Sequence, residues 1–194
     1  WVADSGSAIE TTGTATLTVI GFGGNGTGGY NTGVRVDTGN TIAATNAGVG
    51  DVTIQGTGGG AGETGDVDNG VWLNGGAVSA AGGNISITGT GGSSQGSWDD
   101  GIALTNGSIT NVDAGTITLN GTGKGVTSAN HAYGVELEQG SIISGIDGDV
   151  TVTGIGGGAG DGEDNRGVSV VDAGTTIETT GLGAVHVTGT GTNP

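Results

Sequence analysis

The sequence contains no cysteine and no methionine, one proline, and only three cationic residues, Arg35, Lys124 and Arg166. Without cysteine the chain has neither disulfides nor thiolate ligands for a metal. Nineteen acidic residues bring the net charge to −16. This balance excludes the basic surfaces that bind nucleic acid or anionic membranes. It fits an extracellular surface that repels its own copies or collects divalent cations. No apolar run approaches the roughly 20 residues of a membrane-spanning helix.

Aromatic residues are also scarce, at 3%, and hydrophobic residues of all kinds make up 32%. Glycine, by contrast, accounts for 49 of the 194 residues. On its own this composition is typical of disordered sequence, because each glycine loses much conformational entropy when it becomes ordered. A stack of repeats can offset that cost, since all its units share one narrow apolar column.

The sequence does have a regular repeat. Each copy contains an apolar–polar–apolar triplet, and most triplets continue into Gly-Thr-Gly or a close variant. The triplets begin 32 to 35 residues apart. They are Leu17-Thr18-Val19, Val52-Thr53-Ile54, Ile85-Ser86-Ile87, Ile117-Thr118-Leu119, Val150-Thr151-Val152 and Val185-His186-Val187. A fixed period of this size predicts a stacked array in which each unit covers its neighbour.

Two further columns accompany the triplets. One is the pattern Gly-Val-x-Leu or a close variant, which begins at Gly33, Gly70, Gly101, Gly134 and Gly167. The other is a single β-branched residue behind a small residue, found at Ile9, Ile42, Val78, Ile109, Ile142 and Ile177. Alternation with period two predicts strands with one buried face, and no segment has the periodicity of a helix.

Three short strands per repeat, with Gly and Asn at corners that need positive φ, predict one coil of a parallel β-helix. We therefore expect an all-β solenoid of about six coils with three strands each, and a variable Gly-rich loop in each coil. Residues 1–194 are expected to form a single domain that is an excerpt or a subunit of a longer array. A meander of antiparallel hairpins is the competing prediction. It is weaker because each strand resembles its counterpart one repeat later, as parallel stacking in register requires.

The pattern Gly-Val-x-Leu, Gly-x-x-Ile and Val-Thr-Ile-x-Gly-Thr-Gly-Gly resembles the β-strand repeats of large bacterial surface adhesins of the filamentous-haemagglutinin-like and autotransporter-like kinds. It is carried, for example, by Gly70–Gly91, Gly101–Gly123 and Gly134–Gly156, and it extends over nearly the whole chain. The resemblance implies a secreted, cell-surface, right-handed parallel β-helix that serves as a stalk, adhesin or matrix fibre. No catalytic or binding motif of these proteins matches, so the resemblance assigns no site residues.

Carboxylates arranged for catalysis are few. Glu138 and Asp172 are expected in the same turn of adjacent coils, where each simply precedes a turn glycine. Asp99 and Asp100 are expected to form the polar end of a loop. The chain has few basic partners for lyase chemistry on an anionic polysaccharide. We therefore predict no catalytic residues and no enzymatic activity. A carbohydrate-binding or polysaccharide-degrading β-helix is the alternative.

Acidic loops precede three of the Gly-Val-x-Leu strands. Stacking would bring their carboxylates to one edge, where Ca²⁺ could find the six to eight oxygen ligands it prefers. The candidate ligands are Glu63, Asp66, Asp68, Asp161, Glu163 and Asp164. Against calcium, the nonapeptide Gly-Gly-x-Gly-x-Asp-x-apolar-x of calcium-binding β-rolls is absent. The default expectation is a solvated acidic edge without a metal.

The segments that do not repeat are the candidates for recognition: 58–69, 91–100, 124–133 and 156–166. Trp72, at an outward strand position, and Trp98, in a loop, could each stack on a sugar ring or a partner, although a partly covered surface aromatic is the plainer interpretation. Neither the first nor the sixth coil has a cap, and an open strand edge pairs with another chain. We expect a bacterial extracellular fibre, stalk or adhesin whose partners are adjacent repeats or copies of itself, and cell-surface glycans or matrix.

Overall fold

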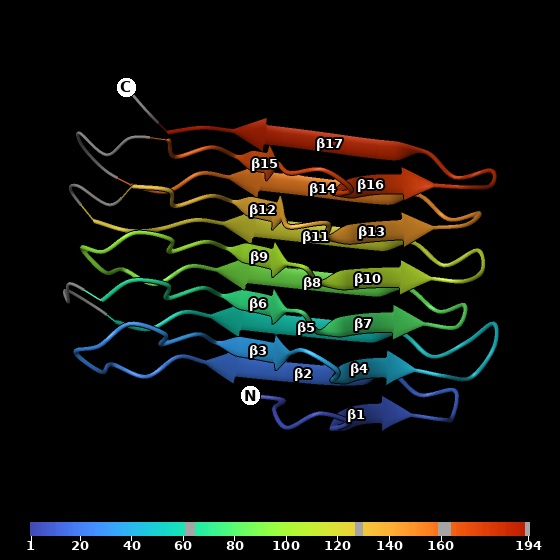
Figure 1. The fold of residues 1–194 in the computed structure, drawn as a ribbon. Coiled ribbons are helices and arrows are strands. Elements are labelled where there is room, and N and C mark those ends of the chain that lie inside the picture. Colours follow the sequence, from blue (N-terminus) through green and yellow to red (C-terminus); the bar gives the residue numbers. More distant parts are fainter. Residues whose placement is uncertain (61–64, 127–129, 159–163, 193–194) are drawn as a thin grey trace.

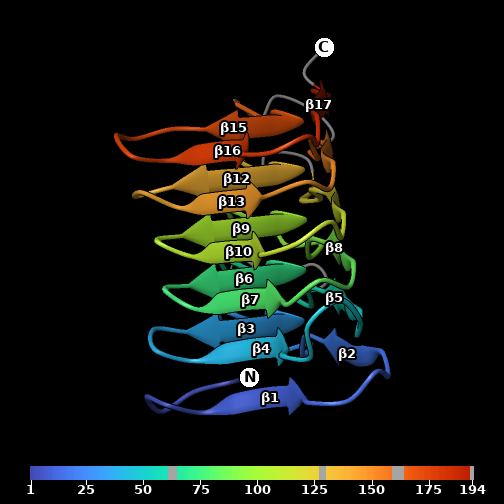
Figure 2. The same ribbon diagram turned by 90° about the vertical axis from the view of Figure 1, so that its right-hand side faces the viewer.

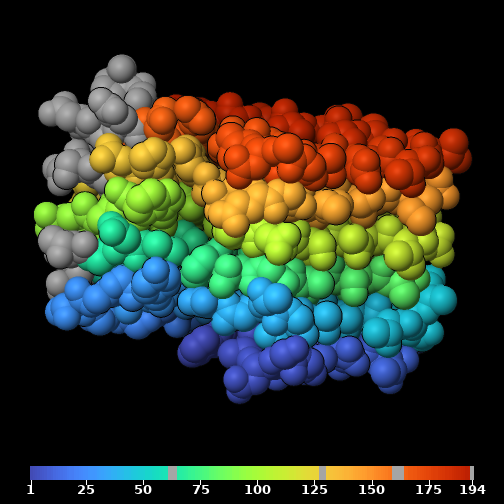
Figure 3. Space-filling view, in the orientation of Figure 1, coloured from blue at the N-terminus to red at the C-terminus, as the bar shows by residue number. Residues whose placement is uncertain are grey.

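The computed structural model describes residues 1–60, 65–126, 130–158 and 164–192. Over this range the chain is a parallel β-helix with three strands per coil, as the repeat predicts. The coils lie on one another as layers from the N-terminus to the C-terminus (Figures 1 and 3). The described residues contain no helix, and so none that is long and apolar enough to cross a membrane.

Three parallel sheets run along the solenoid, each built from one strand per coil. Sheet A contains β3 (Val34–Asp37), β6 (Val71–Asn74), β9 (Ile102–Thr105), β12 (Val135–Glu138) and β15 (Val168–Val170). Sheet B contains β1 (Ala8–Thr11), β4 (Thr41–Ala44), β7 (Ala77–Ala80), β10 (Ser108–Asn111), β13 (Ile142–Gly145) and β16 (Thr176–Thr179). Sheet C contains β2 (Leu17–Phe22), β5 (Val52–Thr57), β8 (Ile85–Thr90), β11 (Ile117–Thr122), β14 (Val150–Ile155) and β17 (Val185–Thr190).

The solenoid is right-handed. In Figure 1 the strands of sheet C run to the left, and those of sheets A and B return to the right in front of them. Figure 2, turned by 90°, places sheet C on the opposite side from sheets A and B. Since the chain rises from the N-terminus to the C-terminus as it circles, this path has the hand that parallel crossover connections prefer.

The columns predicted from the triplets are columns of the structure. The six triplets pair in register along sheet C, from Leu17 opposite Val52 to Val150 opposite Val185. Inward side chains in the middle coils, such as that of Ile87, are fully buried. Because aliphatic side chains of similar shape lie one above another, a chain with few hydrophobic residues still forms a continuous core.

One predicted column contains an error. Ile143, not Ile142, pairs with Ile109 in sheet B. Ile143 is fully buried, whereas Ile142 is 39% exposed. The reason is the corner between β12 and β13, which has three residues (139–141) where the preceding coil has two. The extra corner residue, Ser141, is buried and hydrogen-bonds to the neighbouring coil.

Glycine has two different purposes in the fold. At the corner between sheets A and B, Gly39, Gly75 and Gly140 have positive φ, as predicted for corner positions. Where sheet C ends, glycine allows two backbone segments to approach each other closely. A Cβ on Gly121 would lie deep inside the van der Waals radius of the Gly134 carbonyl oxygen. The Gly-Thr-Gly segment and the Gly-Val-x-Leu strand can therefore touch only because both contain glycine.

The connections from sheet C to sheet A are hydrogen-bonded to one another from coil to coil. Their return segments, such as 66–70 and 97–101, lie in register one coil apart. The Val67 N–H donates to the Ser97 carbonyl at 2.9 Å, and the Gly70 N–H donates to the Asp100 carbonyl at the same distance. The return segments thus form a hydrogen-bonded wall beside the outer face of sheet A.

Candidate functional site, an aromatic and acidic groove

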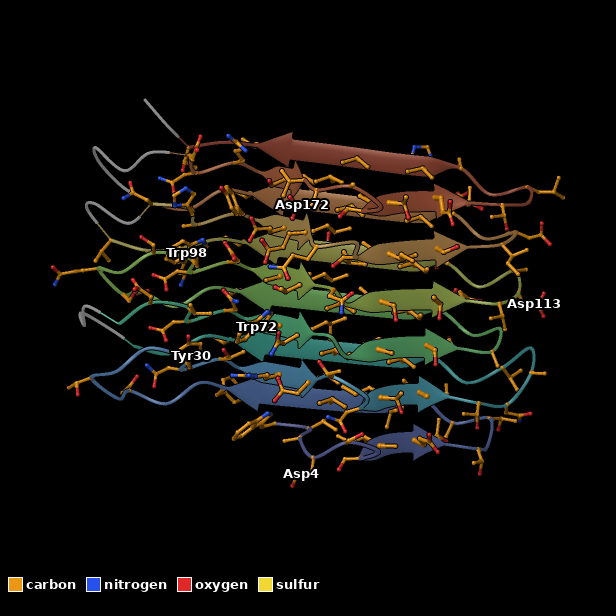
Figure 4. The ribbon with its side chains drawn as sticks, viewed as in Figure 1. Asp4, Tyr30, Trp72, Trp98, Asp113 and Asp172 are labelled. Carbon is orange, nitrogen blue, oxygen red and sulfur yellow. The ribbon has the colours of Figure 1, made fainter. Side chains whose placement is uncertain are left out.

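Five of the six aromatic residues gather on one side of the molecule, over the outer face of sheet A and the adjoining return segments. They are Trp1, Tyr30, Trp72, Trp98 and Tyr133. Figure 4 shows the middle three of these on the same side of the ribbon. The sixth, Phe22, ends β2 in sheet C. Because the chain has so few aromatic residues, this distribution indicates that the outer face of sheet A is the candidate functional surface.

Equivalent positions in five successive coils share a left-handed backbone, with φ between 55° and 68°. They are Tyr30, Val67, Trp98, His131 and Asp164. The conformation is unfavourable for any non-glycine residue and most of all for β-branched valine. The chain thus carries side chains at five positions where glycine would fit the backbone better, although it contains 49 glycines. Such a pattern is typical of a functional surface.

The outward residues of sheet A form the floor of this site. Trp72, Ala103 and Glu136 follow one another in one outward column. The Trp72 indole N–H donates to the Thr105 hydroxyl at 3.1 Å, and that hydroxyl donates to the Glu138 carboxylate at 2.9 Å. This chain of hydrogen bonds fixes the orientation of both the ring and the carboxylate. Because Ala103 is small, the floor is low between Trp72 and Glu136.

A groove of about 290 Å³ lies above these strands. Its walls contain three aromatic rings and three carboxyl groups, those of Tyr30, Trp72, Trp98, Asp100, Glu136 and Glu138. None of its ten described lining residues is Lys or Arg. A second groove of about 330 Å³ adjoins it and shares Tyr30. Together the two grooves form one continuous surface for a ligand.

The second groove is built around Arg35. The guanidinium carbon lies 4.4 Å from the ring centre of Trp72, 5.4 Å from that of Trp1 and 6.0 Å from that of Tyr30. The same side chain pairs with Asp37, with 2.8 Å between Nε and Oδ1. Burial raises the pKa of Asp37, but hydrogen bonds from Arg35 and two other side chains outweigh burial and lower it. Here aromatic rings and a carboxylate together hold a cation.

A smaller aromatic cluster continues the surface toward the C-terminal coils. The Trp98 and His131 rings stack with 5.5 Å between their centres, and the edge of His131 meets Tyr133 at 5.9 Å. Arg166 lies 6.0 Å from the Tyr133 ring centre and pairs with Asp164 at 2.9 Å. Two of the three cations of the chain, Arg35 and Arg166, therefore flank the first groove without lining it.

Asp99 and Asp100 are buried, which overturns the expectation that they belong to a solvated acidic edge. Burial, with the nearby charge of Asp68, raises the pKa of Asp99 to about 7. Burial and the charge of Glu136 raise the pKa of Asp100 well above its ordinary value. Burial and the charge of Glu138 likewise raise the pKa of Glu136 to about 7.

The buried carboxyls of Asp68, Asp99 and Asp100 belong to a ladder of hydrogen bonds between coils. Asp100 Oδ1 accepts the Tyr133 N–H at 2.7 Å. Asn69, at the same position one coil earlier, accepts the Asp100 N–H at 3.0 Å. In the neighbouring column Asp68 accepts the Asn31 N–H at 2.7 Å. Asparagine thus satisfies the same geometry as aspartate without a charge, so the aspartates are not needed for the ladder itself.

The calcium candidates within the described residues do not form one site. Asp66 is exposed, and Asp68 is buried with one carboxylate oxygen unpaired among the described residues. Asp164 lies three coils away and pairs with Arg166. In the described ranges no group of three or more His, Asp and Glu residues could hold a metal ion. The remaining candidates lie outside the described residues: Glu63, Asp161 and Glu163.

Glu138 and Asp172 have separate surroundings. Asp172 accepts the Gln139 N–H at 3.0 Å and so holds the corner of the preceding coil. Glu138 instead faces the groove. Sequence reasoning named Trp72 and Trp98 but missed Tyr30 and Glu136. The loop residues of the site could have been found from the sequence. Each of those with a left-handed backbone stands three positions before the glycine of a Gly-Val-x-Leu strand.

Comparisons with protein-family models, with curated proteins and with solved structures yield no match for this chain. The groove and the two ends of the solenoid are the features of the described residues that bear on its function.

Proposed function

We propose that the chain is an extracellular interaction protein of bacteria, in which the β-helix is a rigid shaft and the groove on sheet A binds carbohydrate. The proposal combines the fibre, stalk or adhesin that the repeat resembles with a binding surface. The observation that carries it is the gathering of five of six aromatic residues over the outer face of sheet A and the adjoining return segments. Aromatic faces stack on sugar rings, and polar groups beside them bond to the hydroxyls.

The shape of the surface suits an extended ligand. The outward column of sheet A runs from Arg35 through Trp72, Ala103 and Glu136 to Ser169. Four strand-to-strand steps of about 4.8 Å give it a length of about 19 Å. A linear oligosaccharide lying along the solenoid axis would contact rings in several successive coils. A polysaccharide chain therefore fits better than a compact small molecule.

The proposal is binding without hydrolysis. Glycoside hydrolysis needs two carboxyl groups that flank the scissile bond. Glu136 and Glu138 stand two residues apart on β12, so both face outward from the same strand. A sugar chain lying over sheet A would have both carboxyls on one side. The third carboxyl of the groove, that of Asp100, is buried and accepts the Tyr133 N–H. The arrangement therefore supports recognition of polar groups rather than acid and base catalysis.

Replacing Trp72 by alanine is expected to weaken binding of a matching polysaccharide about tenfold, because one of the two indole rings of the groove and its contact with Arg35 are lost. Affinity electrophoresis against a panel of soluble polysaccharides, with a reducing-sugar assay on the same mixtures, measures binding and hydrolysis together. Phe22→Ala is the matched control, since Phe22 is an exposed aromatic on sheet C. Equal retardation of both variants and the unaltered chain would contradict the proposal.

The ends of the solenoid support a second proposal, that coils continue by end-to-end stacking into a fibre. At the C-terminal end of the described coils the inward residues Val170, Val185 and Val187 are 40 to 50% exposed, whereas their counterparts in the middle coils are fully buried. At the other end, Leu17 and Val19 are only partly buried. Strands β2 and β17 are the edges of sheet C. Since both edges carry the same inward pattern, the natural partner is a further coil of a second copy or an adjacent repeat.

Val187→Asp is expected to abolish concentration-dependent assembly, because it places a charge where the next coil would pack. Thr188→Asp is the control: it adds the same charge to the same strand but at an outward position. Sedimentation velocity over a range of protein concentrations, with electron microscopy of the largest species, provides the measurement. Assembly that is equally sensitive to both substitutions would point to general charge repulsion and not to stacking of coil ends.

A further inference from the structure

We infer that the groove recognises the ammonium group of an amino sugar, so that the carbohydrate it binds is a cationic polymer of the glucosamine type. The inference rests on the proposed carbohydrate binding and specifies its ligand. It follows from three features of the groove: the pairing of aromatic and carboxylate walls, the absence of a cation among its described lining residues, and the way Arg35 is held next to it.

The walls combine two kinds of group that attract a cation. Ammonium groups are attracted to the faces of Trp and Tyr within about 6 Å of the ring centre, and sites that bind them are built from such rings. Tyr30, Trp72 and Trp98 line the groove. Arg35 lies beside the rings of Trp72 and Tyr30, and Trp98 stacks on His131. A ligand would therefore contact the part of each ring that these neighbours do not cover. Glu138, held by the Thr105 hydroxyl at 2.9 Å, supplies an oriented carboxylate. A neutral sugar would use the rings but would bring no opposite charge to this carboxylate.

The groove has no cation of its own to neutralise these carboxyls. Its described lining residues include Asp100, Glu136 and Glu138 but neither Lys nor Arg. Arg166 offsets only part of this charge at Glu136. Carboxyls that lie close together in a partly desolvated site are unfavourable, and a ligand that brings positive charge relieves this cost. An anionic polysaccharide would instead add to it. Charge complementarity therefore selects a cationic ligand.

The adjoining groove contains an internal example of the same recognition. There the Arg35 guanidinium lies over the rings of Trp1, Tyr30 and Trp72 and pairs with the carboxylate of Asp37. Tyr30 and Trp72 also line the first groove, where the carboxylate is Glu138 in place of Asp37 in the same outward column. The chain thus fills one of two similar environments with its own cation and leaves the other open.

The charged groups around Glu136 define how binding depends on protonation. The charges of Glu138 and Asp172 raise the pKa of Glu136, and the charge of Arg166 lowers it. Glu136 in turn raises the pKa of Asp100, in the neighbouring coil. Burial has the largest effect on Glu136, whose resulting pKa is about 7. A bound ammonium group favours the ionised form of Glu136. A ligand that stays positively charged over this range should therefore release protons from Glu136 when it binds and bind more tightly as the pH rises. The amine of an amino sugar itself loses its proton near neutral pH, so its own binding should be strongest on the acidic side of neutrality.

The test compares three β-1,4-linked hexasaccharides that differ in one substituent: hexaglucosamine, hexa-N-acetylglucosamine and cellohexaose. Isothermal titration calorimetry at about pH 6, where most glucosamine amines are protonated, gives the affinities at low and at physiological ionic strength. Hexaglucosamine is expected to bind about tenfold more tightly than either neutral oligosaccharide, and more of its affinity should be lost with added salt. If all three bind equally, or the neutral ones bind better, carbohydrate binding stands and the inference fails. If none binds, the proposed function fails as well.

Because the whole chain carries a net charge of −16, any polycation is attracted to it, and matched variants separate that effect. Glu138→Gln keeps an oxygen to accept from the Thr105 hydroxyl but removes the groove charge, and it should weaken hexaglucosamine binding about three- to tenfold, a larger factor than for cellohexaose, whose hydroxyls can still bond to the amide. Glu178→Gln removes one charge from sheet B and is expected to have little effect. If the two variants lower the affinity for hexaglucosamine equally, the attraction is non-specific and the inference is wrong.

Discussion

Raising the pH from about 4 to about 8 is expected to lower the free energy of unfolding of this protein by several kcal/mol. The cause is the set of buried carboxyls beside sheet A. Burial raises the pKa of Asp99 from 3.8 to about 7 and that of Glu136 from 4.5 to about 7. Asp100 and Asp68 shift in the same direction, again chiefly through burial.

The sign follows from proton binding. Between about pH 4 and pH 7 these groups are protonated in the folded chain and ionised in the unfolded chain, so the folded state binds more protons. The stabilisation is fully present below pH 4 and is lost as the pH rises through the folded-state pKa. For the buried Asp99, the change in pKa from 3.8 to about 7 corresponds to about 4 kcal/mol of stability. Asp37, whose pKa is lowered, opposes this trend only at the acidic end.

Urea unfolding monitored by circular dichroism, repeated across this pH range, measures the effect. Asp99→Asn should make the chain more stable than the unaltered protein at pH 8 and close to it at pH 4. Asparagine occupies the equivalent position in two other coils, at Asn31 and Asn165, and an amide can still hydrogen-bond to Ser94. Asp113→Asn, at an exposed corner, is the control. It should change the free energy of unfolding by no more than about 0.5 kcal/mol at either pH 4 or pH 8. A stability that rises from pH 4 to pH 8 would refute the explanation.

The strands could be predicted because their signal is strictly periodic. Each triplet of sheet C is repeated at a nearly constant spacing, and parallel stacking in register requires that repetition. The short strands of sheet B are harder to predict, because the sequence identifies each of them by only one β-branched residue. Ser141 lengthens one corner by a residue and moves the buried position from Ile142 to Ile143. Two adjacent isoleucines look alike in the sequence, and only pairing with the next coil decides between them.

The groove was harder to predict because the return segments look like loops in the sequence. Their composition is polar and Gly-rich, which favours solvent exposure. It therefore predicts that Asp99 and Asp100 lie at the polar end of an exposed loop. Burial results from contacts between coils, in which each Asp or Asn side chain hydrogen-bonds to a backbone N–H about 31 to 37 residues away. No local pattern reports such a contact. The aromatic residues are likewise dispersed in sequence, and only the coil brings Tyr30, Trp72 and Trp98 to one face.

Replacing Gly121 by alanine is expected to destabilise the protein by more than about 3 kcal/mol, a larger effect than an ordinary surface substitution has. Gly121 lies in β11 and packs directly against the carbonyl group of Gly134, so an added methyl group would overlap backbone atoms. Gly134 cannot move aside easily, because its N–H donates to the Arg166 carbonyl at 3.0 Å and its carbonyl accepts from the coil before it, at Ile102 N–H.

The same contact recurs where sheet C meets the start of sheet A in each coil, between Gly56 and Gly70 and between Gly89 and Gly101. This explains why a fold with so few hydrophobic residues contains so much glycine: the narrow solenoid forms only if two backbone segments touch. Gly13→Ala is the matched control, because no atom lies within 4 Å of the added methyl group and the backbone has no positive φ. Thermal melts of the two variants should differ by many degrees, with Gly13→Ala close to the unaltered chain. Equal melting temperatures would mean that glycine at this junction is not required for close approach.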